Sequence, residues 1–287
     1  MRINTNVSSL TAQESAVNTN KSITSSLEKL SSGLKINKAS DDASGLAIAD
    51  KLRTQVTSIN QGVANGNSAV ALLQIADKSM AEQSTILDTI KSKLIQANTA
   101  TTSEDGRAAI AKDVSKLLEQ LDNIATQTNY NGTNLLQADR ASGGSANTGV
   151  RTALSFQVGE NKGDMIKTKS IQSNTVGLSL GTLKGNVGGS SFTRAHASAG
   201  QTAVDKAITK LNGYRGDIGS TQNQVESAIR NLTTQATNIK NAESVIRDVD
   251  YAAESANYNK LNIIAQAGSY AISQANSTQQ NVLRLLQ

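Results

Sequence analysis

Few residues of the 287-residue sequence could take part in chemistry. His196, in the stretch TRAHASAG, is the only histidine, and the chain has no cysteine. A histidine-activated nucleophile or a zinc site needs several such groups close together. We therefore interpret His196 as a surface residue of a loop rich in glycine and serine, and we expect no enzyme activity, no cofactor and no metal.

Two patterns that resemble ligand sites have simpler structural explanations. The glycines of GLSLGTLKG lack the Lys-Ser/Thr pair of a phosphate-binding loop and the close glycine spacing of a dinucleotide turn, so they indicate turns. Asp41 and Asp42 follow Ser40, which we predict to be the N-cap of a helix. Both carboxylates would then lie in its first turn, where they interact favourably with the helix dipole.

The composition favours long helices over a large globular core. Only 37% of the residues are hydrophobic and 2% are aromatic, and there is neither proline nor tryptophan. Alanine, serine, asparagine, glutamine, threonine and leucine dominate, which is typical of long helices with narrow apolar seams.

The charge pattern argues against nucleic acid and membrane partners. The net charge is +5, but lysine and arginine are interleaved with acidic residues, whereas a nucleic-acid groove needs clustered basic residues. No run approaches the roughly eighteen apolar residues of a membrane-spanning helix. The N-terminus also lacks the pattern of a cleaved signal peptide.

Both ends of the chain carry apolar residues at helical spacing, which predicts that they are buried. The C-terminal seam is rich in small residues that bury little apolar area, so one pair of such helices would be marginal in a monomer. Many copies packed side by side would order cooperatively. We therefore predict that these residues serve self-assembly: Val7, Leu10, Val17, Ile23, Leu27, Leu30, Leu34, Ile264, Ala271, Ala275, Val282 and Leu285.

The middle of the chain predicts three long helices and a small β region. A change to alternating periodicity predicts one or two β-hairpins from Thr152 to about Leu183, followed by a loop to Gly200. Asn131-Gly132 predicts a tight turn. Seven-residue and four-three steps define the predicted helical seam: Ile59, Leu73, Met80, Leu87, Leu94, Val225, Ile229, Leu232 and Ile239.

Several long motifs closely resemble bacterial flagellin. They are INTNVSSLTAQ, LSSGLKINKASDDASGLAIADKLR, QTNYNGTNLL and the C-terminal stretch that begins ESANYNKLNIIAQAGSY. The matching segments cover roughly the first 137 and the last 75 residues in the correct order. The short middle that does not match makes the chain resemble a minimal flagellin without large outer domains.

The resemblance implies a mainly α-helical fold of coiled-coil bundles with two domains. Residues 1–42 and 249–287 would form the terminal coiled coil of the filament's inner tube. Residues 43–248 would form a rod domain of three long helices, with a β-hairpin and loop region at about 138–200. The chain would self-assemble into the helical flagellar filament, the propeller for swimming. A coiled-coil adhesin or a secretion-needle component is the alternative, which the diameter of the polymer would distinguish.

The resemblance also implies partners and a route. The flagellar type III system would export the chain to the outside of the cell without a cleaved signal peptide. An export chaperone, the filament cap and the hook-filament junction proteins would bind it, besides other copies of itself. A hairpin from Thr152 to Ile171 and the helices beside it would switch between two packings.

One family feature is altered. Many flagellins carry Gln-Arg-Val-Arg-Glu-Leu in a rod-helix patch that the vertebrate innate flagellin receptor recognises. An ungapped count from NYNG places Asp88, Thr89, Ile90, Lys91, Ser92 and Lys93 at this patch. Threonine cannot replace the planar donor of arginine, and Ser92 lacks the carboxylate. We therefore predict poor binding to this receptor.

Overall fold

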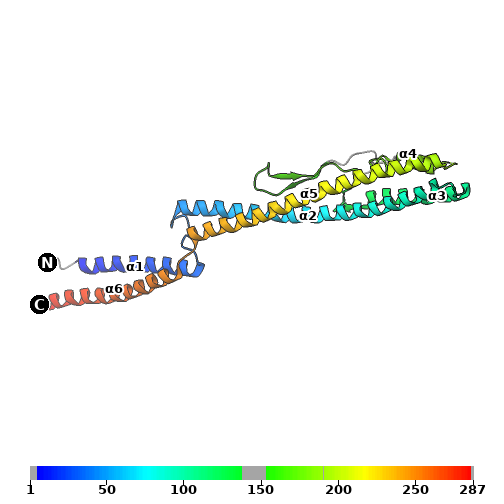
Figure 1. The fold of residues 1–287 in the computed structure, drawn as a ribbon. Helices are drawn as coiled ribbons and strands as arrows, with labels where there is room; N and C mark the ends of the chain where they lie inside the picture. Colours follow the sequence, from blue (N-terminus) through cyan, green and yellow to red (C-terminus); the bar gives the residue numbers. More distant parts are fainter. Residues whose placement is uncertain (1–4, 138–152, 190, 286–287) are drawn as a thin grey trace. The chain divides into compact units, whose positions relative to one another are not determined.

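The structure, a computed structural model, describes residues 5–137, 153–189 and 191–285, without the side chains of 282–285. Helices make up most of the described chain, which confirms the expected mainly α-helical fold with small β-hairpins (Figure 1). The helices are α1 (Val7–Ser32), α2 (Ala43–Asn98), α3 (Glu104–Gln127), α4 (Gly181–Val187), α5 (Arg194–Arg247) and α6 (Tyr251–Leu285). The strands are β1 (Asn129–Tyr130), β2 (Thr133–Asn134), β3 (Ser155–Gln157) and β4 (Met165–Lys167).

The chain divides into two compact units. Unit 1 comprises Met1–Thr57 and Ala236–Gln287, and unit 2 comprises Ser58–Gln235. Helices α2 and α5 therefore contribute to both units. The domain boundaries expected from the sequence, at 42/43 and 248/249, both lie inside unit 1, at the start of α2 and between α5 and α6, so that division into domains stays a prediction.

The core of unit 2 lies between α2, α3 and α5 and is capped by α4 and the segment before it. Five residues of the predicted α2 seam are at most 1% exposed: Ile59, Leu73, Met80, Leu87 and Leu94. On α5, Val225 is fully buried, whereas Ile229, Leu232 and Ile239 are half-buried.

Helix α2 has a second buried row, which does not run through its valines. Val56, Val63 and Val70 are only half-buried, and the buried row runs through Ala69, Ala76, Gln83, Ile90 and Ala97. Small residues predominate in this row, so the neighbouring helices can approach closely.

The start of α2 corrects one expectation. The helix begins at Ala43, and the Asp42 carboxylate accepts a hydrogen bond from the Gly45 amide at 2.9 Å, so Asp42 is the N-cap and not Ser40. Asp41 lies before the helix, where its carboxylate accepts hydrogen bonds from the amides of Asn37 and Lys38. Serine and aspartate both cap helices well, so the sequence alone does not tell which of Ser40, Asp41 and Asp42 takes the N-cap position.

The β region partly follows the prediction. Asn131 and Gly132 form the β1–β2 turn with φ of 49° and 76°. Strands β3 and β4 form the predicted hairpin, in which Phe156 pairs with Ile166. The hairpin rests on α2 and α5 through Val158 and Ile166. Thr152 lies outside the described residues.

The segment after the hairpin differs from the expected second hairpin and long loop. The GLSLGTLKG stretch contains the short helix α4, whose Leu183 and Val187 are buried one turn apart in the core. Helix α5 starts at Arg194 and not after Gly200. Glycine and serine are frequent in both segments, so burial of a few apolar residues decides the structure there.

Candidate assembly surface

Helices α1 and α6 of unit 1 lie side by side and antiparallel (Figure 1). Near the chain ends, the Asn6 side-chain amide donates to the carbonyl oxygen of Ala275 at 3.2 Å. Toward the other end of the pair, the hydroxyl of Ser26 donates to Oε1 of Glu254. Side-chain contacts therefore bridge the two helices near both ends of the pair.

Small residues predominate on the α1 side of the seam between α1 and α6, whereas the α6 side mixes small and large residues. The more buried positions of both helices recur at alternating steps of three and four, as in a coiled coil. On α1 these positions are Ser9, Ala12, Ala16, Thr19, Ile23, Ser26 and Leu30. On α6 they are Glu254, Tyr258, Leu261, Ala265, Gly268, Ile272, Ala275 and Gln279.

This seam differs in register from the one predicted. Ile23, Leu30 and Ala275 lie in it, but Leu27, Ile264 and Ala271 are exposed. Small side chains such as Ala16 and Gly268 allow close approach in the seam, beside a few larger residues such as Leu261, whereas many other large apolar side chains of the two helices are exposed. Ser26 was not predicted from the sequence as a seam residue, because the seam was assigned to large apolar residues such as Leu27.

Leu34 takes another position, in the junction after α1. It forms a β-bridge with Asp248, beside which the Lys35 amide donates to the carbonyl of Arg247 at 2.6 Å. The Val249 amide donates back to the carbonyl of Gly33 at 3.0 Å. The side chains of Val282 and Leu285 lie outside the described part of the chain.

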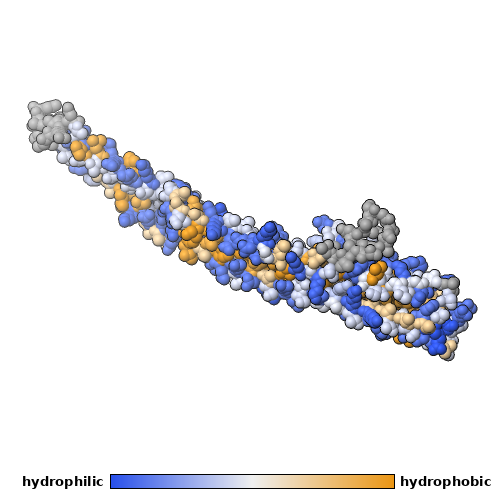
Figure 2. Space-filling view, turned by 90° about the horizontal axis from the view of Figure 1, so that it is seen from above, coloured by the Kyte–Doolittle hydropathy of each residue, from blue (hydrophilic) through white to orange (hydrophobic). Residues whose placement is uncertain are grey.

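The outer faces of unit 1 expose large apolar side chains, and apolar patches reach the surface near both termini (Figure 2). Of the fourteen exposed large apolar side chains in the described residues, only Ile75, Ile95, Met165 and Val176 belong to unit 2. Patches of this kind on a soluble chain mark interaction sites. The ten in unit 1 are Val7, Leu10, Val17, Leu27, Ile48, Val245, Tyr251, Ile263, Ile264 and Tyr270.

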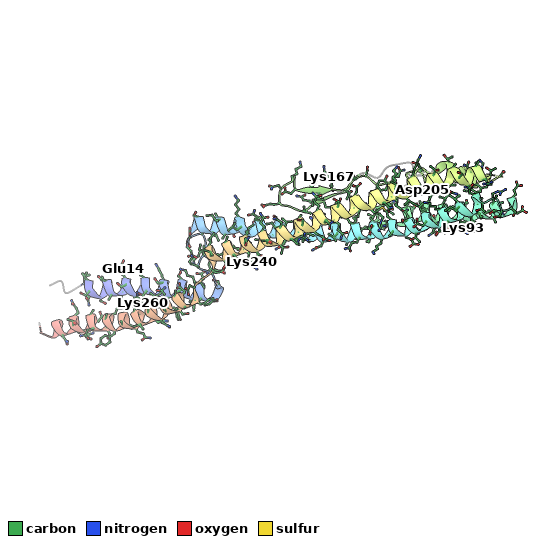
Figure 3. The ribbon with its side chains drawn as sticks, in the orientation of Figure 1. Glu14, Lys93, Lys167, Asp205, Lys240 and Lys260 are labelled. Atoms are coloured by element: carbon green, nitrogen blue, oxygen red, sulfur yellow. The ribbon has the colours of Figure 1, made fainter. Side chains whose placement is uncertain are left out.

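The patch on α2 that was singled out from the sequence is mostly exposed. Asp88, Thr89 and Ser92 are exposed, whereas Ile90 is fully buried. Lys91 forms an ion pair with Asp205 of α5 at 2.6 Å. Charged side chains such as Lys93 and Asp205 project from the helices here (Figure 3).

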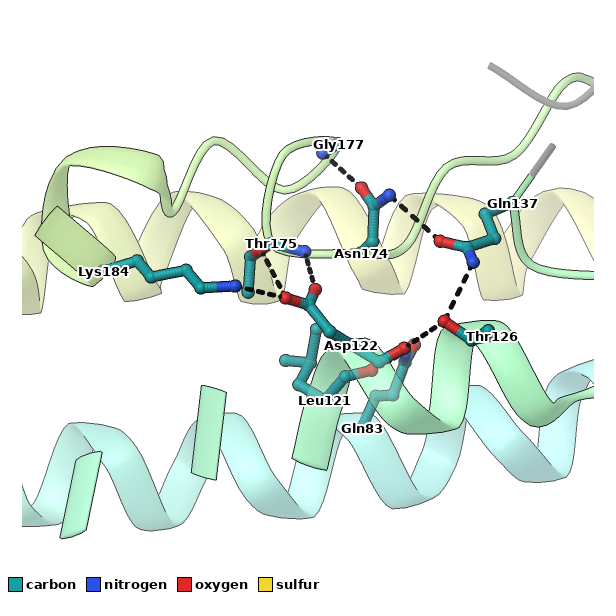
Figure 4. Close-up of polar contacts among 9 residues, drawn as sticks. All are labelled: Gln83, Leu121, Asp122, Thr126, Gln137, Asn174, Thr175, Gly177 and Lys184. Atoms are coloured by element: carbon teal, nitrogen blue, oxygen red, sulfur yellow. Dashed lines mark hydrogen bonds and ion pairs between the residues drawn. The ribbon is translucent and has the colours of Figure 1, made fainter. Parts of the chain in front are cut away.

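A buried polar cluster joins α2, α3 and the segment before α4 (Figure 4). The Gln83 side-chain amide donates to the carbonyls of Leu121 and Ser173 at 3.2 and 3.1 Å. The Asp122 carboxylate accepts from the Thr175 amide and from Lys184, both at 2.7 Å. A glutamine at a heptad position among apolar residues is the signal that could have predicted this cluster.

His196 is a helix-capping residue and not a loop residue. It lies half-buried in the first turn of α5, and its ring is 6.2 Å from that of Phe192. Its amide donates to the Thr193 hydroxyl at 3.3 Å, and its Nδ1 accepts from the Thr193 amide at 3.4 Å. This is a capping box with histidine in the place of glutamate.

The described residues contain neither a candidate metal cluster nor a helix fit to span a membrane. Residues 5–137, 153–189 and 191–285 contain no group of three or more His, Cys, Asp or Glu side chains that could hold a metal ion. None of the helices in the part of the chain that the structure describes is long and apolar enough to cross a membrane.

Comparison with known proteins decides the family. Residues 3–141 match the bacterial flagellin N-terminal helical region, and residues 201–286 match the bacterial flagellin C-terminal helical region. The chain belongs to the bacterial flagellin family. It is thus a structural subunit of the flagellar filament, which decides against the adhesin and the secretion needle.

Individual flagellar proteins are similar over the full length. The flagellar filament 33 kDa core protein of Treponema phagedenis is 35% identical, and the flagellin of Bacillus subtilis is 32% identical, each with complete coverage of both chains. A putative flagellar hook-associated protein from Vibrio parahaemolyticus shares the fold at 14% identity, with a TM-score of 0.61 over 72% of this chain and 99% of that chain. The short length fits a minimal flagellin. Flagellar filament proteins are extracellular components of the flagellum.

Proposed function

We propose that the outer face of the α1–α6 pair joins this flagellin to neighbouring copies in the filament's inner tube. The observation that carries the proposal is the concentration of exposed large apolar side chains in unit 1. The seam between α1 and α6 contains many small residues and therefore buries little apolar area within one chain. Most of the stabilisation of the chain ends would then come from other copies. Residues 43–248 would then form the rod domain around the tube.

Seeded growth of filaments tests this surface. Leu10 and Val17 are 55% and 53% exposed, so Leu10→Asn with Val17→Asn removes apolar contact area without disturbing the packing inside one chain. We expect this variant to lose seeded growth. Ile75→Asn, at a position 40% exposed in unit 2, is the control and should polymerise. Normal growth of the Leu10 and Val17 variant would refute the assignment of the surface.

The finer partners follow from the family. We expect the free C-terminal segment to bind an export chaperone, and the assembled filament to contact the cap and the hook-filament junction proteins. We also expect type III export without cleavage. Mass spectrometry of filament protein should then find the N-terminal segment intact, and a shortened N-terminus would contradict this route.

Poor recognition by the vertebrate innate flagellin receptor is proposed for the α2 patch. Asp88, Thr89 and Ser92 offer no arginine fork, and Lys91 is already paired with Asp205. Loss of two anchors of about 2 kcal/mol each would weaken binding roughly a thousandfold.

Restoring the missing groups tests that proposal. Thr89→Arg with Ser92→Glu should partly restore signalling in receptor reporter cells, because both positions are exposed. Thr85→Arg with Ser92→Glu, one turn away on the exposed face of α2, is a control for added charge. Full activity of the unmodified protein would contradict the proposal.

We also propose that the protein has no catalytic role and needs no cofactor. Flagellins are a structural family, and the single histidine serves as a helix cap. An assay of purified filaments with and without a metal chelator should show the same filament stability.

A further inference from the structure

The seam between α1 and α6 discriminates weakly between pairings. Alanine, glycine and serine recur along both helices at the more buried positions, including Ala12, Ala16, Ala265 and Gly268. Such residues bury little area and fit many partners. The larger seam residues, such as Leu30 and Leu261, pack through the hydrophobic effect, which is non-directional, so two α1 helices or two α6 helices from different copies could also bury them. Apolar packing alone therefore does not select the correct pair.

A polar contact in the buried part of the seam needs a particular side chain on each helix. Ser26 is only 2% exposed, and its hydroxyl donates to Oε1 of Glu254. The Asn257 side-chain amide donates to the same oxygen at 3.3 Å. At the far end, the Asn6 side-chain amide donates to the Ala275 carbonyl at 3.2 Å and to Oδ1 of Asn276 at 3.4 Å. Every residue offers a carbonyl, and the contact with Asn276 is long and exposed to water, so the Asn6 contacts are less selective.

The junction between the end of α1 and the start of α6 does not by itself select which helices pair. Backbone hydrogen bonds between Lys35 and Arg247, and between Val249 and Gly33, tie the two helices at one end of the pair. They involve main-chain atoms only. Along the rest of the pair the side chains of the seam decide which helix lies opposite.

We propose that the Ser26–Glu254 hydrogen bond determines the pairing specificity of the chain ends, by favouring α1 with α6 over two α1 or two α6 helices. The proposal rests on the assembly role proposed above, in which many identical ends meet. In a pair of α6 helices, Glu254 would be partly desolvated without the Ser26 hydroxyl, which disfavours that pair. Single buried polar groups specify partners in coiled coils in the same way.

Cysteine cross-linking can measure the pairing, because the natural chain has no cysteine. Ala16 and Ala265 are half-buried seam positions about midway between the two polar contacts. Ala16→Cys alone reports pairs of α1 helices as covalent dimers, and Ala265→Cys alone reports pairs of α6 helices. Both substitutions together report the α1–α6 pair as a cross-link within one chain.

The test compares Ser26→Ala and Glu254→Ala, each of which removes the hydrogen bond, with Ser25→Ala, a neighbouring half-buried serine. In seeded, oxidised filaments we expect each of the first two to raise the dimer fraction of the single-cysteine proteins about tenfold, the effect of one hydrogen bond to a charged group. Ser25→Ala should leave it unchanged. Equal dimer fractions in all variants would overturn the proposal.

Failure of the assembly role has a different signature. If the unmodified chain does not grow from seeds, the proposed function is wrong. The same cross-linking in the soluble chain then tests the pairing proposal. An increase in dimers for the Ser26 and Glu254 variants would support it, and equal dimer fractions would overturn it. A double variant of Ser26 and Glu254 should resemble either single one, because both remove the same bond.

Discussion

Glu254 lies in the first turn of α6, where Ser26 and Asn257 both donate hydrogen bonds to its carboxylate. The Ser26 hydrogen bond lowers the pKa of Glu254 from its usual value near 4.5, against the opposing effect of burial. A carboxylate with a lowered pKa in the folded state contributes stability above its unfolded value, and this contribution is lost as the pH falls through the folded value.

We therefore predict that acid weakens the α1–α6 pair below about pH 4.5. Ser26→Ala should reduce this acid sensitivity, because the pKa of Glu254 then returns toward its usual value. The pKa of Asp41, which the Asn37 amide lowers, is not affected by this substitution. Filament mass against pH, measured by sedimentation, should show a smaller change for Ser26→Ala. An identical pH profile would contradict the prediction.

The capping box of α5 gives a second residue-scale prediction. His196→Ala removes the acceptor for the Thr193 amide and should lower the free energy of unfolding by about 1 kcal/mol. His196→Gln should retain most of the stability, since glutamine is a regular capping-box residue. Denaturant unfolding of the soluble protein measures both. Equal losses for the two variants would show that the ring packing against Phe192 matters more than the cap.

At the scale of elements, the β3–β4 hairpin is fixed to α2 at a close approach. The Asn65 side-chain amide donates to the Gln157 carbonyl at 3.2 Å. A Cβ at Gly62 would lie 2.6 Å from the Val158 carbonyl oxygen, so only glycine fits there. The hairpin and α2 would therefore have to move together in any change of packing. This supports the hypothesis that the hairpin takes part in switching between two filament packings.

We predict that Gly159→Val alters the filament waveform. A Cβ at this position would lie 2.4 Å from Cβ of Asp164, whose carboxylate accepts from the Asn161 amide and holds the turn. Gly163→Ala is the matched control, because its new Cβ would meet nothing within 4 Å. Electron microscopy and swimming assays should show straight filaments or slow swimming for Gly159→Val only. A normal waveform would mean that the hairpin is not the switch.

Element prediction from sequence succeeded where the periodicity was long. The seven-residue steps of α2 identified Leu73, Met80 and Leu87, all buried. It failed where small or polar residues form the contact, because their burial depends on the neighbouring element. The buried side chain of Gln83 donates to two carbonyls on other segments, and Leu183 is buried because α4 packs on the core of unit 2. The position of Gln83 among apolar seam residues signals a buried polar contact, but no local pattern tells which segments Gln83 and Leu183 meet.

At the scale of the whole molecule, the family and the mainly α-helical fold were predictable, because long motifs at both ends identify flagellin. The seam of the chain ends was only partly predictable. Its positions follow the expected four-three spacing, but Ser26 and not Leu27 faces α6. Sequence hydrophobicity places leucine inside, whereas this chain exposes Leu27 and other apolar residues that a neighbouring copy could cover.

The central claim is that the chain ends drive assembly and that the rest of the molecule folds without other copies. Deletion of residues 257–287 tests it most directly, because α6 then loses most of its length while the core of unit 2 keeps all its residues. The account predicts that the shortened protein retains cooperative unfolding and helical content in unit 2 but shows no seeded growth by light scattering. Normal filaments from the shortened protein would contradict the account.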